Sequence, residues 1–317
     1  MLYIWKPDTQ PTLVPDSDFQ KQILEPETLF WFDIALEPTE LRHYLEQLTF
    51  LHPLTIERIF SHESRAFLTE FDQYLHLLIH ELNYSKTFEV NLVDCHFILS
   101  ENFLITIHQD PIKNFESFVF EPPPTRFFKN GTDLLFYYLV EPLLSSGFNV
   151  LDEIADLTEN IEDRILPQPE RALLNELFDL KKDLMNLRKA LAPMREIMAQ
   201  LSRRENTFVD EAALPFMSHL YDLIIRLYEM CELQRDLVSG ALELYLSSIS
   251  NRMNEVMMTL TVVSTLILPL TLIVGYYGMN FRYFPETNWH YGIPFVVGLM
   301  LTVVALMLWY FKKRKWF

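Results

Sequence analysis

The chain has 317 residues, half of them hydrophobic, and its 43 acidic and 26 basic residues give a formal net charge of −17. This balance argues against a nucleic acid as partner, because phosphate backbones bind to cationic surfaces. The first of only seven glycines is Gly131, so residues 1–130 contain no glycine-rich phosphate loop. We therefore expect neither a nucleotide nor an organic cofactor. Cys95 and Cys231 lie far apart with no CxxC pattern, which argues against a disulfide framework.

Residues 1–131 are predicted to form a cytoplasmic α+β domain. Short apolar runs rich in aromatic residues indicate strands, and Ser100–Asn102 separates two of them as a hairpin connection would. Glu40–Leu48 and Leu54–Phe60 instead have apolar residues at helical spacing. The sheet is expected to be largely antiparallel, and the proline-rich stretch Glu121–Thr125 marks the end of the domain.

Residues 132–250 are predicted to form long cytoplasmic helices. The first helix is expected to break near Pro142, after which Phe148–Leu166 repeats apolar residues every three or four positions. The second helix covers Glu170–Arg204. The third covers Pro215–Tyr277, which is 63 residues, or about 95 Å at 1.5 Å per residue. A helix of this length is not expected to be stable alone, and it therefore implies a bundle.

Residues 251–317 are predicted to form a transmembrane domain. Val256–Tyr277 and Tyr291–Phe311 are runs of 22 and 21 residues without a charge, and a bilayer core needs about 20 apolar helical residues. Two spans put both chain ends on one side of the cell (inner) membrane. Arg252 flanks the first span and a basic tail flanks the second, so both termini of this multi-pass protein are expected in the cytoplasm. The basic tail consists of Lys312, Lys313, Arg314 and Lys315.

One face of the first predicted span carries small and polar residues in an otherwise aliphatic segment. Because such a face must contact protein or water, it indicates either a pore lined by symmetry-related copies or a helix–helix contact. A pore requires an oligomer, since two spans cannot enclose a water-filled path. This face, the polar stripe, consists of Asn254, Met257, Leu260 or Thr261, Ser264, Leu268, Thr271 and Gly275. Its extension towards the N-terminus, the cytoplasmic stripe, consists of Asp236, Glu243, Ser247 and Ser250.

The segment Tyr277-Gly278-Met279-Asn280-Phe281 stands where the first span ends. It resembles the YGMNF signature of the CorA-type magnesium transporters. The likeness covers the helical and membrane half strongly and the N-terminal domain more loosely. The other matching segments are Ser247–Asn251, Asn254–Met257, Leu268–Thr271, Phe284–Glu286, Trp289, Lys312–Trp316, and His52-Pro53-Leu54 with Glu57.

The resemblance implies a funnel-shaped homopentameric channel in membrane lipid, rather than an enzyme, that passes hydrated Mg²⁺ and also Co²⁺ or Ni²⁺. The polar stripe would line its pore, with Met257 and Leu260 at a hydrophobic constriction. Glu286 in the outer loop would either concentrate cations or be an ordinary solvated carboxylate. The entrance site would consist of Gly278, Met279 and Asn280.

Two positions depart from the family pattern. Many relatives hold a regulatory ion between subunits with carboxylates, and here the two corresponding positions are Arg58 and His219. A guanidinium is a permanent donor and cannot ligate a metal. We expect Arg58 to pair instead with a carboxylate such as Asp222 across the interface; alternatively, closure uses other carboxylates such as Glu57.

Three further alternatives follow from the sequence. The basic tail could contact the acidic helix face within Asp152–Asp163. The alternative is that this acidic face is simply exposed to solvent. The chain also resembles the zinc-transporting branch of the same superfamily. A third hypothesis, from a different functional class, is a membrane-anchored regulatory protein that has lost transport.

Overall fold

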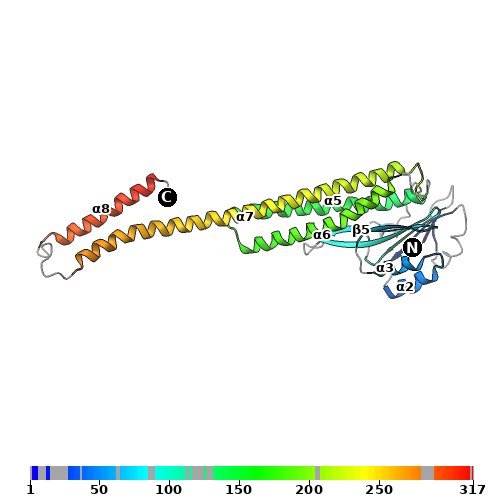
Figure 1. Cartoon of the computed structure of the whole chain (residues 1–317), viewed down its shortest axis with the longest axis horizontal. Coiled ribbons are helices and arrows are strands. Elements are labelled where there is room, and N and C mark those ends of the chain that lie inside the picture. Colours follow the sequence, from blue (N-terminus) through cyan, green and yellow to red (C-terminus); the bar gives the residue numbers. More distant parts are fainter. Residues whose placement is uncertain are drawn as a thin grey trace. The chain divides into compact units, whose positions relative to one another are not determined.

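The computed structural model describes residues 2–5, 12–14, 28–35, 38–61, 65–84, 90–110, 112, 115, 125, 131–203, 208–279, 289–314 and 316. The chain divides into two compact units. The first comprises residues 1–164 with 170–242, and the second comprises residues 165–169 with 243–317. Figure 1 shows the sheet and most of the helices in the first unit, and the end of α7 with α8 in the second.

A seven-stranded sheet forms the centre of the first unit, in the order β2-β1-β3-β7-β6-β5-β4. All neighbouring strands are antiparallel except β3 and β7, which run parallel. The expectation of a largely antiparallel sheet is thus confirmed. Ser100–Asn102 joins β6 to β7 as a hairpin, and the Ser100 N–H donates to the Phe103 carbonyl at 2.9 Å. The strands are β1 Leu2–Trp5, β2 Thr12–Val14, β3 Leu29–Ala35, β4 Phe67–Glu70, β5 Leu75–Tyr84, β6 Val90–Leu99 and β7 Phe103–His108.

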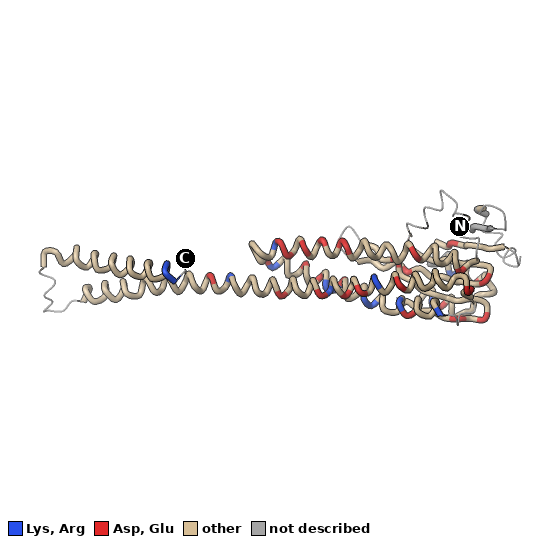
Figure 2. Tube along the Cα trace, turned by 90° about the horizontal axis from the view of Figure 1, so that it is seen from above, with Lys and Arg blue, Asp and Glu red and all other residues tan. Residues whose placement is uncertain are grey.

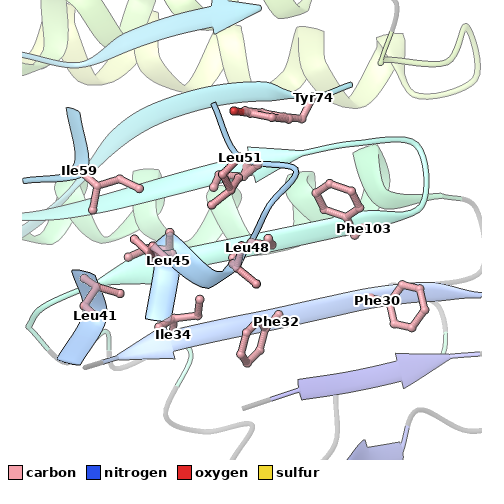
Figure 3. Packing of buried hydrophobic residues seen from close by; sticks show 13 residues of the cluster. Phe30, Phe32, Ile34, Leu41, Leu45, Leu48, Leu51, Ile59, Tyr74 and Phe103 are labelled. Atoms are coloured by element: carbon pink, nitrogen blue, oxygen red, sulfur yellow. The ribbon is translucent and has the colours of Figure 1, made fainter. Parts of the chain in front are cut away.

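Two short helices, α2 (Pro38–Gln47) and α3 (Pro53–Ile59), pack on one face of this sheet. The four-residue spacing of Leu41 and Leu45 on α2 turns both side chains into the same cluster. Figure 3 shows these residues beside side chains of the strands. The cluster comprises Phe30, Phe32, Ile34, Leu41, Leu45, Leu48, Leu51, Ile59, Tyr74, Ile98, Phe103, Ile105 and Ile107.

Local hydrogen bonds fix the start of α3. His52 caps this helix, because its Nδ1 accepts from the Leu54 N–H at 3.2 Å, and Pro53 occupies the first turn without losing a bond. The Tyr74 hydroxyl accepts from the His52 N–H at 2.9 Å and lies 2.8 Å from the Thr55 hydroxyl. These contacts tie α3 to the sheet, and they fix the helix that carries Arg58.

The remaining helices are long. One expectation was wrong, because the helix that begins at Thr132 does not break at Pro142 but continues to Ile165. A proline in a helix removes one backbone hydrogen bond and costs about 3 kcal/mol, but Leu139 and Leu143 on either side are buried. Their packing offsets the lost bond. The long helices are α5 Thr132–Ile165, α6 Arg171–Leu201, α7 Leu214–Tyr277 and α8 Gly292–Lys313.

Gly147 permits a close approach of α5 to the sheet and to α7. A Cβ atom at this position would lie 2.7 Å from Leu82 Cδ1 on β5 and 2.8 Å from Leu227 Cδ2 on α7. Both distances are shorter than van der Waals contact, so only glycine fits without a shift of the neighbouring side chains. Gly147 therefore allows α5, β5 and α7 to pack closely in the first unit.

By length and composition, three of the described helices are candidates to cross a membrane: α5, α7 and α8. In α5, 56% of the most apolar stretch is buried inside the protein, compared with 6% in α7 and 0% in α8. The apolar side chains of α5 thus belong to the core of the first unit, and only those of α7 and α8 need another apolar environment. Figure 2 shows that charged residues crowd the first unit and are scarce on the far half of α7 and on α8.

Two buried histidines face each other on neighbouring strands of the sheet. His76 Nε2 on β5 lies 3.2 Å from His96 Nδ1 on β6. Burial, with the charge of His96 and of Arg58, lowers the pKa of His76 to about 2. Burial also lowers the pKa of His96 to about 4, against the smaller opposing effect of Asp94. Both rings are therefore neutral in the folded protein at physiological pH.

This histidine pair predicts that the first unit loses stability in mild acid. Because the folded-state pKa values lie below the unfolded value of about 6.5, the unfolded chain binds more protons as the pH falls below 6.5. At pH 5.5 each histidine should then lower the free energy of unfolding by about 1.4 kcal/mol relative to pH 7.5. Thermal unfolding of the full chain at both pH values measures the loss.

The double variant His76→Leu/His96→Leu replaces both titrating rings by apolar groups. Its free energy of unfolding should therefore decrease less between pH 7.5 and pH 5.5 than that of the wild type. The matched control is His43→Leu, which removes an exposed histidine of α2. An acid-induced loss of the same size in the double variant and the control would contradict the assignment.

Candidate ion pathway

The α7 helix runs without interruption from Leu214 to Tyr277, although it contains Pro269. Residues three and four positions apart on one continuous helix lie on the same face. The polar stripe is therefore a single face of α7, and its members are exposed within the chain. Even the apolar members Met257, Leu260 and Leu268 expose 58%, 61% and 73% of their surface.

A shallow cavity of about 750 Å³ lies along this face in the second unit. It brings together four members of the polar stripe, namely Ser264, Leu268, Thr271 and Gly275, and one residue of the expected entrance site, Met279. The sequence analysis missed the flanking walls of the cavity. These are Ile267, Leu272 and Tyr276. In the sequence, these three residues are distinguished only by lying next to stripe positions on the helix surface. Ordinary lipid-facing residues have the same property, so the sequence alone could not single them out.

The hydroxyl groups on this part of α7 are oriented by the helix backbone. Thr271 Oγ1 donates to the Ile267 carbonyl at 3.0 Å, and Thr261 Oγ1 donates to the Met257 carbonyl at 2.7 Å. Because each hydroxyl proton is used inside the helix, the hydroxyl oxygens keep their lone pairs for an outside donor. Such an oxygen can accept a hydrogen bond from a water molecule in the shell of a hydrated cation.

The end of α7 is built tightly around Gly278. The Gly278 N–H donates to the Val274 carbonyl at 2.9 Å, and a Cβ at this glycine would lie 3.0 Å from the same oxygen. Met279 follows with 47% of its surface exposed. The other expected residues of this end, Asn280 and Glu286, lie outside the described residues.

The cytoplasmic stripe is also exposed along α7. Asp236 accepts a hydrogen bond from the adjacent Arg235 at 3.1 Å, while Glu243, Ser247 and Ser250 follow at spacings of seven, four and three residues. Seven residues make almost two helical turns, so these residues continue roughly the same face.

The two positions that depart from the family pattern have separate partners within the chain. The Arg58 guanidinium lies 4.6 Å from the centre of the Phe67 ring and donates to the Thr69 hydroxyl. His219 Nδ1 lies 3.1 Å from the Tyr137 hydroxyl. Both Arg58 and His219 are exposed, so their outer faces are accessible to another molecule.

Lys312 and Lys313 belong to the last turn of α8, Arg314 is its C-terminal cap, and all three are exposed. The Lys313 ammonium lies 5.2 Å from the centre of the Trp309 ring, and the Arg314 guanidinium lies 5.8 Å from that of Tyr310. Aromatic and basic side chains at one helix end are typical of a membrane–water boundary. Lys315 lies outside the described residues.

A family model described as "CorA-like Mg2+ transporter protein" matches residues 26–313. The chain belongs to the CorA-like Mg²⁺ transporter family. This CorA-like chain is 33% identical over 295 residues to "Cobalt/magnesium transport protein CorA" of Thermotoga maritima, covering 90% of this chain and 83% of that protein. It is 35% identical over 292 residues to "Putative metal ion transporter YfjQ" of Bacillus subtilis, covering 91% and 90%.

The fold of the CorA-like chain is also that of a solved full-length transporter. The CorA magnesium transporter from Methanocaldococcus jannaschii superposes with a TM-score of 0.83 at 21% identity, covering 100% of this chain and 99% of that one. The family resemblance and the fold class, a soluble α+β part with long helices and terminal apolar helices, are thus confirmed. The relatives are ion transporters rather than enzymes, as expected, and membership in their family places this chain in a membrane.

Proposed function

We propose that the protein conducts divalent cations, above all Mg²⁺, into the cytoplasm through a pore lined by α7 of five identical subunits. The observation that carries this proposal is the exposed polar stripe on one face of α7, four members of which line one cavity together with Met279. Relatives named for cobalt and magnesium transport support a divalent cargo. In this assignment residues 1–131 and 132–250 are cytoplasmic, and residues 251–317 lie in and beside the membrane.

An oligomer is required by the bilayer itself. A polar face on a membrane helix must be shielded from lipid, and the two helices of one chain cannot enclose a water-filled path. Copies of α7 around a symmetry axis would turn their polar stripes towards one another, with α8 outside them. A homopentamer is what the family resemblance implies, and the threonine hydroxyl oxygens described above would then face the axis.

The chemistry of this face fits a cation that keeps its water. Mg²⁺ dehydrates reluctantly and usually retains several water ligands. No carboxylate occurs between Glu255 and Glu286, so the span itself would select by neutral oxygens that accept hydrogen bonds from the hydration shell. Such contacts hold an ion weakly enough for it to leave again. With the termini in the cytoplasm, a membrane potential of 100 mV would drive a divalent ion inward with about 4.6 kcal/mol.

Ion flux into proteoliposomes tests the function directly. Vesicles that contain the purified protein should take up Mg²⁺ in response to an inside-negative potential. Replacing the external Mg²⁺ by Zn²⁺ or Co²⁺ measures the ion preference. A proton gradient imposed without a potential separates a channel from a proton-coupled carrier. Uptake of Zn²⁺ alone, or no flux of any divalent ion, would overturn the proposal in favour of a zinc transporter or a non-transporting regulatory protein.

Asn280→Ala is expected to abolish divalent uptake while leaving the oligomer assembled. The side-chain amide supplies both donor and acceptor groups to the ion's water shell, and the symmetry-related copies act together at the entrance. Uptake and gel-filtration size measure the two effects. The control is Asn175→Ala, which changes an exposed asparagine of α6 in the first unit. Near-normal uptake by a correctly assembled Asn280→Ala protein would remove Asn280 from the entrance site.

Replacing both Met257 and Leu260 by Ser or Gly is expected to raise the basal conductance. These apolar side chains would form a ring that loses its water when narrow, and polar or small residues would keep it wet. Single-channel or vesicle flux recordings measure the change. Met258→Ser with Val263→Ser serves as the control, since both residues are exposed on α7 but lie off the polar stripe. A lower or unchanged conductance in well-assembled protein would place the gate elsewhere.

The closed state of this chain is expected to depend only weakly on Mg²⁺ at the position of Arg58. Arg58 places a permanent charge where relatives are expected to hold an ion, and the imidazole nitrogen of a histidine such as His219 is a poor ligand for Mg²⁺. Chelation of Mg²⁺ should therefore change protease sensitivity and subunit symmetry little in the wild type. Arg58→Asp should introduce a stronger response.

Arg171→Asp, an exposed arginine at the start of α6, controls for the change of charge alone. A wild-type protein that opens sharply on chelation would contradict this prediction, as would a hydrated ion found between Arg58 and His219.

A further inference from the structure

Two arginines line one cavity at the edge of the sheet. The sheet ends at β4, and α6 packs against this edge strand. A cavity of about 320 Å³ lies between β4, α3 and α6, entirely within the first unit. Its lining comprises Arg58, Ser61, Arg65, Ala66, Phe67, Leu68, Pro193, Glu196, Ile197 and Gln200.

Neither guanidinium is neutralised within the described part of the chain. Arg58 is engaged by the Phe67 ring and the Thr69 hydroxyl, both uncharged groups. Among the described residues no ion pair is formed by Arg58 or Arg65, and Glu196 on the opposite wall forms none either. The positive charge of Arg58 contributes, after burial and His96, to the lowered pKa of His76.

This arrangement stands out against the charge of its surroundings. Residues 1–255 contain 42 acidic and 21 basic residues, a net charge of −21, so anions are repelled from most of this surface. Two arginines that share a cavity also repel each other unless an anion lies between them. Arg58 is held in place by its contacts with Phe67 and Thr69, so part of the cost of ordering it is already met before any ligand arrives.

We propose that this cavity binds a phosphate group, either as free phosphate or as part of a phosphorylated small molecule. The planar fork of a guanidinium matches the oxygens of a phosphate in a two-bond arrangement, which a spherical anion such as chloride cannot satisfy equally well. The side chains of Pro193 and Ile197 give the cavity an apolar wall beside this charged part. The Glu196 carboxylate limits affinity by repulsion, and its removal strengthens binding.

Binding to the full-length protein in lipid nanodiscs, with a chelator present to remove Mg²⁺, tests the site. Inorganic phosphate, pyrophosphate and ATP are the three probes, and equilibrium dialysis gives their dissociation constants. If phosphate and pyrophosphate bind and ATP binds no more tightly than they do, the ligand is a free anion. Tighter binding of ATP identifies a nucleotide or a related phosphorylated compound.

Three variants separate the site from general effects of charge. Arg65→Gln, which leaves Arg58 in place, should weaken binding of the best probe by about tenfold, because one charge-assisted pair is lost. Glu196→Gln should strengthen it several-fold, a gain that a misfolded protein would not show. Arg171→Gln removes an exposed arginine of α6 outside the cavity and should change nothing.

Two results would overturn the proposal. One is the absence of binding by any probe at millimolar concentration, or equal binding by the wild type and Arg65→Gln. The other is a wild type that binds no phosphate but whose oligomer dissociates in Arg65→Gln, because a carboxylate of a neighbouring subunit would then fill the cavity. Mg²⁺ uptake measured on the same preparations reports the proposed transport function separately, so failure of one does not decide the other.

Discussion

The structure depends on one constraint, which is that a helix in lipid must cover its polar groups. Most of the far half of α7 is aliphatic, but one face presents hydroxyl, amide and glycine positions that are exposed within the chain. Exposure of that face to lipid would be unfavourable. Turned towards copies of itself, as proposed, it would form the wall of a water-filled path. In the proposed function, the oligomer, the pore and the hydrated cargo would all follow from the need to shield this face from lipid.

The first part of α7 is held by contacts within the first unit. Asp133 at the start of α5 accepts from the Leu134 N–H at 2.7 Å and from the Asp210 N–H at 3.0 Å, which fixes the segment that leads into α7. Farther along, Gly147 allows α5 to touch Leu227 of α7. Beyond these contacts, α7 continues as one helix to Tyr277.

Periodicity was sufficient to predict the long helices, since the 3.6-residue repeat is a local property, and α7 begins one residue before the expected start. The spacing of small and polar residues at three and four positions also predicted the polar stripe, which lies on one face of α7. Pro142 was misjudged because its effect depends on packing by Leu139 and Leu143, which local sequence does not reveal. The approach of His76 to His96 follows from the register of β5 and β6, and the cavity that Arg58 and Arg65 share exists because α6 packs beside β4. These are tertiary relations between residues with no shared motif.

Arg58 differs in one physical respect from the carboxylates of a metal-sensing site. An ion held between carboxylates can dissociate, so its concentration sets the charge at the site, whereas a guanidinium remains charged at any physiological pH. Its position on Phe67 and Thr69 fixes that charge in space as well. Arg65 adds a second cation to the same cavity. Under the two proposals made above, the soluble species that changes the charge of this cavity would be an anion rather than the proposed cation cargo, and regulation at this position would be independent of that cargo.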